Sequence, residues 1–357
     1  MPEMRDSILS EALRRGKAER GKGEIDYIRF REGFRGIERG TVIAGKRVIW
    51  GFPHIRRVFT LEKGLEKNIA AETIYAEEKI DGFNVRIALL GKKICAFSRG
   101  GFLDLFVTEK ARGMKLERFF RDYPDSVLCA EMLGNTPYTE PADKFDVRLF
   151  VFDIDAGDGS YLPCEEKYKL LKKYGIESPP VLGKFSSGDY EGLRRLAVSI
   201  NKARKEGMVL KSADRGKAVK YVTPLSDIED IAKESGLLFD MPIGFFYQRV
   251  LRSAFFISDF GLPREEYEKR LGKAFYGALT GAIKDAKAGR PVSAEFEILI
   301  KDPAVWDDIR KHMSREVKLE VLWRREEEGG IRIRFSKVYR KTSKTLIAYA
   351  AGKGITD

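Results

Sequence analysis

Residues 78–84 read EKIDGFN, and this stretch decides the fold. Asp81 and Gly82 form a dipeptide that is typical of tight turns, so the turn can present Lys79 at the mouth of a sheet. A lysine amine in that position is a candidate nucleophile for phosphorus. The alternative is a hairpin turn with a surface lysine, and the short motif alone does not separate the two.

Lys79 can attack phosphorus only as the free amine. An ordinary lysine has a pKa of about 10.4, so only about one in 2,500 is neutral at pH 7. A site that lowers this pKa to about 7 destabilises the ammonium by about 4 kcal/mol, through burial or neighbouring cations. We expect Lys211, Lys220 or a divalent ion to provide that positive field.

Five further motifs follow in one order along the chain. They are SRGG at 98–101, Glu131 within CAEMLG, Phe152 within VFDID, EGMVLK at 206–211, and Val219-Lys220. The ordered set contains a ribose acceptor, an aromatic ring for a base, an acidic metal ligand and cations for phosphates. These are the parts of an enzyme that attaches a nucleotide to its own lysine and passes it on.

Each motif also has an ordinary structural interpretation. Glu131 lies in an apolar strand and needs a partner, which is either a ribose hydroxyl or a structural arginine. Phe152 is either a face for a purine or a core side chain. Arg99 precedes two glycines that permit close approach to a phosphate, or it is a surface arginine in a turn.

Glu206 and Lys211 are five residues apart and would point to opposite faces of a regular strand. Gly207 allows a bend that could bring both toward one pocket. Glu206 would then help to hold a metal, and Lys211 would meet the α-phosphate. The alternative is a buried strand end with two solvated charges.

Together the six motifs resemble those of the covalent nucleotidyltransferase superfamily, which comprises DNA ligases, RNA ligases and mRNA capping enzymes. The resemblance spans residues 79 to about 221. It is strongest for ATP-dependent RNA ligases, because Asn84 stands where RNA ligases carry asparagine and DNA ligases usually carry arginine. The segments FPHIRRVFTLEKGL, EKIDGFNVR and SRGG are similar to those of archaeal RNA ligases that act as homodimers and circularise RNA.

The resemblance implies an α+β nucleotidyltransferase core, ATP-grasp-like, of antiparallel sheets with inserted helices. It also implies that Lys79 takes AMP from ATP with Mg²⁺ or Mn²⁺ and that the AMP then activates the 5′-phosphate of a single-stranded RNA. A 3′-hydroxyl of the same or another strand completes the phosphodiester. The implied nucleotide contacts are Glu78, Asn84, Arg99, Glu131, Phe152, Glu206, Lys211 and Lys220, with Glu206 also a metal ligand.

Two departures from the family pattern matter. The last motif of the family commonly has two lysines one residue apart, whereas this chain has Lys220 with Lys217 nearby, so the phosphate contact stays open between them. Nothing after residue 225 resembles the oligonucleotide-binding barrel of DNA ligases and capping enzymes, which favours an RNA ligase. A DNA ligase, a capping enzyme and a non-catalytic RNA-binding protein remain the alternatives.

Composition bounds these interpretations. A net charge of +12 favours a polyanionic partner, although a solvated surface is about as consistent with it. The chain has three widely spaced cysteines and two histidines, which supports neither a disulfide framework nor a zinc cluster. It contains no apolar run long enough to cross a membrane, and its start lacks a secretory pattern, so we expect a cytoplasmic protein.

The chain divides into four predicted segments. Residues 1–65 form an N-terminal domain, 66–225 the adenylyltransferase core, 226–290 a helical domain and 291–357 a small α+β domain. The family resemblance implies that the helical domain, which is rich in apolar side chains, serves dimerisation. We expect helices at 4–19, 165–174, 190–205 and after Pro263, strands at 25–30, 41–43, 48–50, 85–90, 94–98, 127–133, 147–154 and 208–211, and a strand–helix–hairpin tail that turns at EEEGG.

Overall fold

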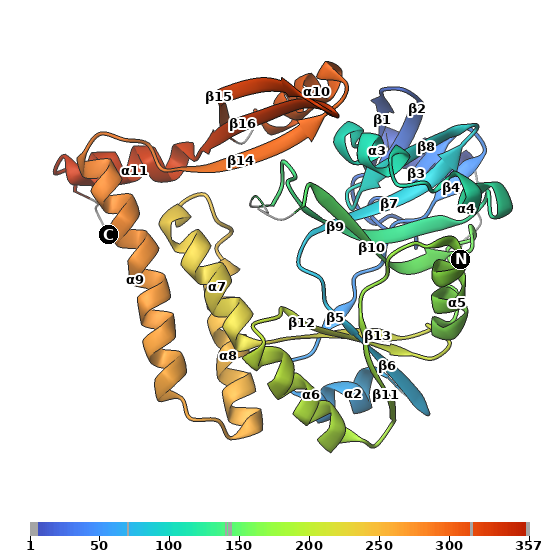
Figure 1. The fold of residues 1–357 in the computed structure, drawn as a ribbon, viewed down its shortest axis with the longest axis horizontal. Coiled ribbons are helices and arrows are strands. Elements are labelled where there is room, and N and C mark those ends of the chain that lie inside the picture. Colours follow the sequence, from blue (N-terminus) through green and yellow to red (C-terminus); the bar gives the residue numbers. More distant parts are fainter. Residues whose placement is uncertain (1–5, 70, 140, 142–144, 315–316, 355–357) are drawn as a thin grey trace.

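The structure is a computed structural model that describes residues 6–69, 71–139, 141, 145–314 and 317–354. Within these residues the chain has an α+β nucleotidyltransferase fold, in which helices surround four sheets (Figure 1). No described helix is both long and apolar enough to cross a membrane.

The N-terminal sheet has the order β1-β2-β3-β4, and the expected strands at 25–30, 41–43 and 48–50 are confirmed within one or two residues. The helix expected over 4–19 ends at Arg14, because Gly16 adopts a left-handed backbone (φ 66°) and the chain then turns into β1. The elements are α1 (Asp6–Arg14), β1 (Ala18–Lys22), β2 (Asp26–Phe30), β3 (Val42–Ala44) and β4 (Arg47–Ile49).

Two sheets form the core. The first has the order β10-β9-β7-β8, and the second has the order β11-β6-β12-β13-β5. Their strands are β5 (Arg56–Arg57), β6 (Thr73–Glu78), β7 (Phe83–Leu90), β8 (Lys93–Ser98), β9 (Val127–Gly134), β10 (Val147–Asp155), β11 (Val181–Ser186), β12 (Gly207–Ser212) and β13 (Ala218–Val222). All neighbouring pairs are antiparallel except β13 and β5. The strands predicted in this region are confirmed.

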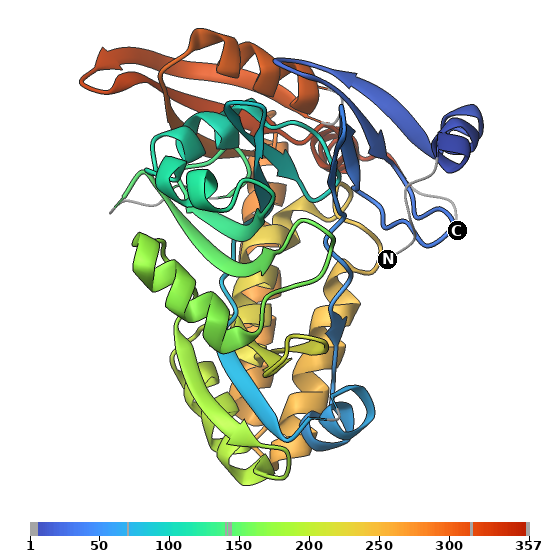
Figure 2. The ribbon, with the colours of Figure 1, turned by 90° about the vertical axis from the view of Figure 1, so that its right-hand side faces the viewer.

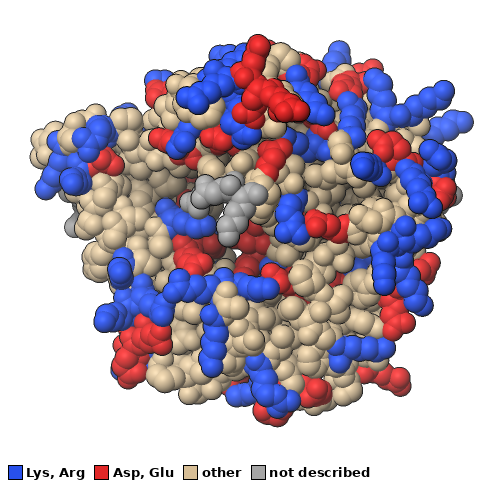
Figure 3. Space-filling view, in the orientation of Figure 1, with Lys and Arg blue, Asp and Glu red and all other residues tan. Residues whose placement is uncertain are grey.

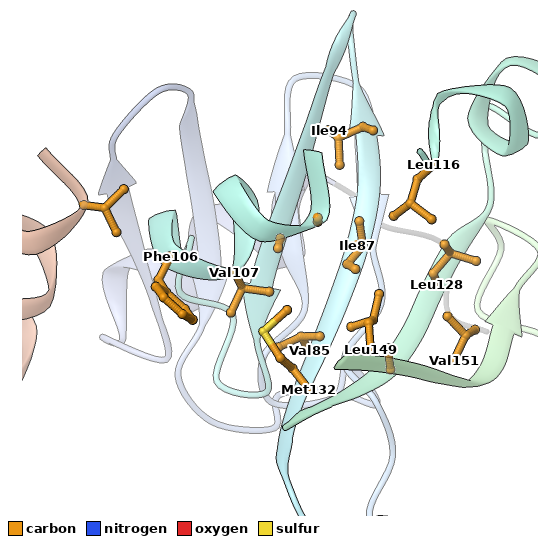
Figure 4. Close-up of a cluster of buried hydrophobic side chains, with 14 of the residues drawn as sticks. Val85, Ile87, Ile94, Phe106, Val107, Leu116, Leu128, Met132, Leu149 and Val151 are labelled. Atoms are coloured by element: carbon orange, nitrogen blue, oxygen red, sulfur yellow. The ribbon is translucent and has the colours of Figure 1, made fainter. Parts of the chain in front are cut away.

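Helices cover these sheets. The predicted helix at 165–174 is α5, and the one at 190–205 is α6, where Asp189 caps the helix by accepting a hydrogen bond from the Gly192 N–H. The helices of the core are α2 (Leu61–Asn68), α3 (Leu105–Arg112), α4 (Glu117–Asp122), α5 (Cys164–Tyr174) and α6 (Tyr190–Lys202). Figure 4 shows the apolar side chains of α3 directed at those of the β7–β9 sheet.

Residues after Pro224 are helical, as expected. They form α7 (Pro224–Glu234), η1 (Ser235–Leu237), α8 (Phe245–Phe260) and α9 (Glu265–Lys287). The α7, α8 and α9 helices lie side by side, and both α8 and α9 contact α7 (Figures 1 and 2).

The tail has the predicted strand–helix–hairpin order, followed by one further helix. It consists of β14 (Ser293–Ile300), α10 (Pro303–Met313), β15 (Lys318–Glu327), β16 (Gly330–Val338) and α11 (Arg340–Ala350). Its apolar side chains share one cluster with the β7–β10 sheet. The carboxylate of Glu109 on α3 accepts hydrogen bonds of 2.8–2.9 Å from the backbone N–H groups of Lys301 and Asp302. The tail is therefore fixed against the core, close to the end of the sheet that carries residues 79–84.

Candidate active site

Lys79 follows the last residue of β6, and two contacts fix its position. Its backbone N–H donates to the carbonyl of Gly207 over 3.0 Å. Its Nζ lies 2.5 Å from Oε2 of Glu206, and the two side chains are only 18% and 15% exposed. The predicted nucleophile and the predicted metal ligand, 127 positions apart, are therefore in direct contact.

The turn after Lys79 packs tightly against β9. A Cβ at Gly82 would lie 2.5 Å from the carbonyl oxygen of Met132, so this close approach requires glycine. Burial raises the pKa of Asp81, the nearby Asp230 raises it further, and Lys79 opposes the shift. The tight turn predicted from the sequence thus places a second carboxylate beside the lysine.

A cavity of about 130 Å³, which we call the Lys79–Lys220 pocket, collects the predicted nucleotide-binding residues. Its lining includes Glu78, Lys79, Asn84, Arg99, Glu131, Phe152, Lys211 and Lys220. Glu206 instead borders an adjoining cavity of about 220 Å³, the Glu206 pocket. Lys79 lines both cavities, so its side chain stands where the two spaces meet.

The apolar part of the Lys79–Lys220 pocket is larger than the sequence suggested. Phe152 lies at its wall, and the ring of Phe52 meets it edge-to-face with a centroid distance of 5.1 Å. The other apolar lining residues are Ile55, Ile80, Pro179 and Val209. The sequence analysis did not predict Phe52 and Ile55 as site residues, although both lie in the segment FPHIRR, which carried part of the family resemblance.

Glu131 and Asn84 are direct partners across β9 and β7. The Asn84 amide donates a hydrogen bond to Glu131, while its Oδ1 is buried and accepts none from the described residues. Burial raises the pKa of Glu131 to about 7; Lys79 opposes this rise, whereas Glu206 and Asp81 add to it. A buried acceptor without a donor is costly, so this pair is prepared for a ligand with hydroxyl donors.

Glu206 is the second carboxylate with a strongly shifted titration. Burial raises the pKa of Glu206 to about 7, and Asp81 adds to the rise while Lys79 lowers it. Gly207 makes the geometry possible, because a Cβ there would lie 2.1 Å from the Tyr221 carbonyl oxygen and other residues rarely adopt its φ of +155°. Gly207 begins β12 in regular register with Val222, and Glu206, the residue before the strand, contacts Lys79. The structure thus shows a close approach of Gly207 to β13 rather than the predicted bend.

Lys220 and Arg99 form the basic part of the pocket wall, and Arg57 lies next to Lys220 outside the lining. Burial and these two arginines, together with Lys79, lower the pKa of Lys220 to about 8. Arg57 stands beside Lys220 across the β5–β13 pair, and its buried Nε has no acceptor among the described residues. Lys217 is exposed and is not part of the lining. Lys220 is thus the lysine of this motif that reaches the pocket, and Arg57 is a basic group that the sequence analysis missed.

Lys211 lies deeper than expected. Its ammonium is only 1% exposed and donates to Glu77 at 2.8 Å, to the Phe152 carbonyl at 2.7 Å and to Asp153 at 3.0 Å. Arg215 also binds Asp153, with contacts of 2.7 and 2.8 Å. All three donors of Lys211 are engaged, so direct contact with a phosphate would require one of these bonds to break. The charged residues of this network are far apart in the sequence, on β6, β10 and β12 and the turn at Arg215. The sequence pattern therefore did not predict that they pair.

The described side chains around Lys79 do not form a complete metal-binding cage. Among the described residues no group of three or more histidine, cysteine or acidic side chains is placed to hold one. Hard divalent cations such as Mg²⁺ are commonly held by one or two carboxylates and the phosphates of a nucleotide, so a complete protein cage is not required. Glu206 and its neighbour Asp81 fit that limited role.

The fold and this pocket define a class: a covalent nucleotidyltransferase, with a buried lysine among an apolar wall, the Asn84–Glu131 pair and a basic patch. The model of the RNA ligase family matches residues 72–222. The model of the C-terminal region of ligase Pab1020 matches residues 235–353.

Comparisons with individual proteins extend over nearly the whole chain. The structure of a putative ATP-dependent DNA ligase from Aquifex aeolicus matches with a TM-score of 0.92 and 30% identity, covering 98% of this chain and all of that one. An archaeal ATP-dependent RNA ligase matches with a TM-score of 0.90 and 27% identity, over 98% and 96% of the two chains. An uncharacterised protein of Methanocaldococcus jannaschii is 29% identical over 92% of this chain and 88% of its own length. The chain belongs to the RNA ligase family that includes the archaeal ATP-dependent enzymes.

Gly207→Ala tests whether the close approach of Gly207 to Tyr221 positions Glu206. A methyl group would meet the Tyr221 carbonyl, so the backbone must shift and carry Glu206 away from Lys79. We expect a lower melting temperature and at least about a tenfold loss in the rate of ATP-dependent ligation. Gly188→Ala is the control, because a Cβ there meets nothing within 4 Å. Equal rates for the two variants would show that this close approach does not set the site.

Proposed function

We propose that this protein is an ATP-dependent RNA ligase that joins a 5′-phosphate to a 3′-hydroxyl through a lysyl-AMP and an adenylated RNA. The observation that carries the proposal is the position of Lys79, 2.5 Å from Glu206 and in the wall of a pocket with separate apolar, acidic and basic regions. Membership of the RNA ligase family supports the same chemistry.

The nucleotide would use each region of the pocket. Its purine would stack at Phe152 among the apolar side chains, and its ribose hydroxyls would donate to Glu131 and to the unpaired Oδ1 of Asn84. Its phosphates would meet Lys220, Arg99 and the neighbouring Arg57, with Lys211 contributing positive charge from below.

The Lys79–Glu206 contact gives a route to the free amine. The ammonium can pass a proton over 2.5 Å to the carboxylate, whose pKa is raised to about 7 by burial. The transfer leaves two neutral groups and a free lone pair on the Lys79 nitrogen. The Lys79 nitrogen then forms a bond to the α-phosphorus, and the bond from that phosphorus to the pyrophosphate oxygen breaks.

The later steps reuse the same phosphorus-binding groups. The 5′-phosphate of an RNA displaces Lys79 from the AMP, and an RNA 3′-hydroxyl then displaces AMP and forms the phosphodiester. A divalent cation, Mg²⁺ or Mn²⁺, would neutralise phosphate charge, and Glu206 is the carboxylate best placed to hold it. Positioning and charge neutralisation therefore account for most of the proposed catalysis.

Self-labelling with α-labelled ATP and Mg²⁺, followed by a denaturing gel, tests the nucleophile. The Lys79→Ala variant should form no labelled band, and Lys220→Ala should lose about 100-fold in labelling rate because a phosphate contact is removed. Lys217→Ala is the control, because Lys217 belongs to the same motif but is exposed and lies outside the pocket. This variant should label like the parent. Undiminished labelling of Lys79→Ala would contradict the proposal.

The name of the Aquifex protein keeps DNA as a second candidate substrate. We expect joining of 5′-phosphorylated RNA to exceed joining of the matched DNA by at least about tenfold, since the chain belongs to the RNA ligase family and the 2′-hydroxyl is the group by which a protein distinguishes RNA from DNA. Ligation of the two strands of equal sequence, with and without a complementary splint, measures the preference. Faster joining of nicked DNA than of RNA would favour a DNA ligase.

We also propose that the protein is a homodimer that uses its helical region. Large apolar side chains are exposed on and around α8 and α9, among them Ile243 (96%), Tyr247 (60%) and Tyr276 (68%). Exposed apolar patches of this kind mark protein interfaces.

Light scattering tests the dimer. The parent should give twice the chain mass, and Leu251→Lys on α8 should shift the protein to a monomer by burying a charge in the interface. Val321→Lys is the control, because Val321 is similarly exposed but lies on β15. A parent that remains a monomer at high concentration would contradict the dimer.

A further inference from the structure

Two larger cavities continue from the Glu206 pocket, away from the proposed nucleotide. The first, which we call the Arg249 pocket, has a volume of about 510 Å³ and shares Asp81, Leu133, Asp230 and Lys233 with the Glu206 pocket. The second, the Phe102 pocket, has a volume of about 570 Å³ and shares Tyr138, Lys337 and Tyr339 with the Arg249 pocket. Because neighbouring pockets share lining residues, the three pockets lie in a row from Lys79 to the Phe102 pocket, and we call this row the path.

The surface agrees with such a path. Figure 3 shows a hollow at the centre of the face seen in Figure 1, with acidic side chains in its depth and basic side chains around its rim. The path runs between the core and the tail, because the Phe102 pocket is lined both by residues of β7 and β8 and by residues of α10 and β16.

The Phe102 pocket is rich in aromatic rings. Phe83 and Tyr138 stack on each other with a centroid distance of 4.2 Å, and His312 meets Phe102 edge-to-face at 6.0 Å. Phe83 is the strand neighbour of Asn84, and Ser98 in the same lining is the neighbour of Arg99. Successive residues of a strand face opposite sides of a sheet. The Phe102 pocket therefore lies on the other face of the sheet from Asn84 and close to it in sequence.

Phe102 is held in place yet remains open to the cavity. The guanidinium of Arg29 covers its ring at 3.4 Å from the centroid. Arg29 is itself fixed by Glu19 at 2.8 Å and by the Gly100 carbonyl at 2.9 Å. Phe102 nevertheless remains 38% exposed. A fixed ring with exposed area is a platform for stacking.

Polar groups surround this platform. His312 Nδ1 lies 2.9 Å from the Asp308 carbonyl and 3.2 Å from its carboxylate, which orients the ring. Tyr138 donates to the buried Asp104 over 2.7 Å. Lys337, only 6% exposed, contacts the ring of Phe296 at 3.8 Å and borders both large cavities. Flat apolar faces, edge acceptors and a cation are the features that recognise a nucleotide of a single strand.

We propose that the Phe102 pocket binds a nucleobase of the RNA substrate, and that the strand reaches Lys79 through the Arg249 pocket. The proposal rests on the proposed ligase function for its substrate class. Phe102 provides the stacking face, Asp308 and His312 contact the base edge, and Lys337 meets a backbone phosphate. The tail domain thereby helps to select and orient the strand end that reacts in the core.

Equilibrium binding of fluorescent 5′-phosphorylated RNA, followed by anisotropy without ATP at fixed salt, tests the pocket independently of catalysis. One set of RNAs carries a single abasic nucleotide at successive positions next to each end. For the parent, one abasic position should weaken binding by at least about fivefold, the effect of losing one stacked base. Phe102→Ala should bind intact RNA with that same weaker Kd and show no further loss at that position.

Three further variants separate a pocket from a general structural effect. Phe102→Tyr keeps the ring and should restore the sensitivity to the abasic position, and His312→Ala should reduce it. Tyr123→Ala is the matched control. Tyr123 is an aromatic residue of similar exposure, 37%, that contacts other rings, but it lies outside both large cavities. It should keep the parental pattern.

Two results would overturn the inference. One is a parent protein that binds every abasic RNA as well as the intact RNA. The other is an abasic penalty that is equal in the parent and in Phe102→Ala. Neither result bears on the ligase proposal, which depends on the covalent lysyl-AMP and is measured without RNA.

Discussion

The contact between Lys79 and Glu206 is the interaction on which the rest of the site depends. It joins the end of β6 to the start of β12, and it brings an amine and a carboxylate together in a place where neither is well solvated. Burial raises the pKa of Glu206 to about 7, so this carboxylate is a weaker acid than usual and can accept a proton near neutral pH. The proposed role of Lys79 as a nucleophile depends on this acceptor, which lies 2.5 Å from the amine.

The surrounding charges are divided by position. Acidic groups, Asp81, Glu131 and Glu206, lie around Lys79, whereas Arg99 and Lys220 form a basic part of the pocket wall, with Arg57 beside Lys220. Glu77, Lys167, Lys211, Asp153 and Arg215 form a buried network. Removing one member of such a network would leave an uncompensated charge, so the network fixes β6, β10, β12 and α5 against one another. The network thereby fixes the strands that carry the pocket residues, and only Glu77 and Lys211 of its members line the pocket.

Much of this arrangement was accessible from the sequence. Ordered motifs predicted the core fold, and all the predicted nucleotide-binding residues except Glu206 line one pocket, while Glu206 contacts Lys79 from the next. Periodicity found the strands of the β7–β10 sheet because each alternates or is continuously apolar. It missed β1, β5, β6, β11 and β13, of which β11 is half-exposed and carries glycine, and it extended the first helix past Gly16. Patterns cannot show which of several charged residues pair across strands, so the burial of Lys211 and the role of Arg57 became visible only in three dimensions.

The account is tested most directly by peptide mass spectrometry of the full-length protein after incubation with ATP and a divalent cation. It predicts one adenylate, attached to the side chain of Lys79, in the peptide that contains residues 79–84. An adenylate on a different lysine, or none at all in protein that melts cooperatively and binds ATP, would contradict it.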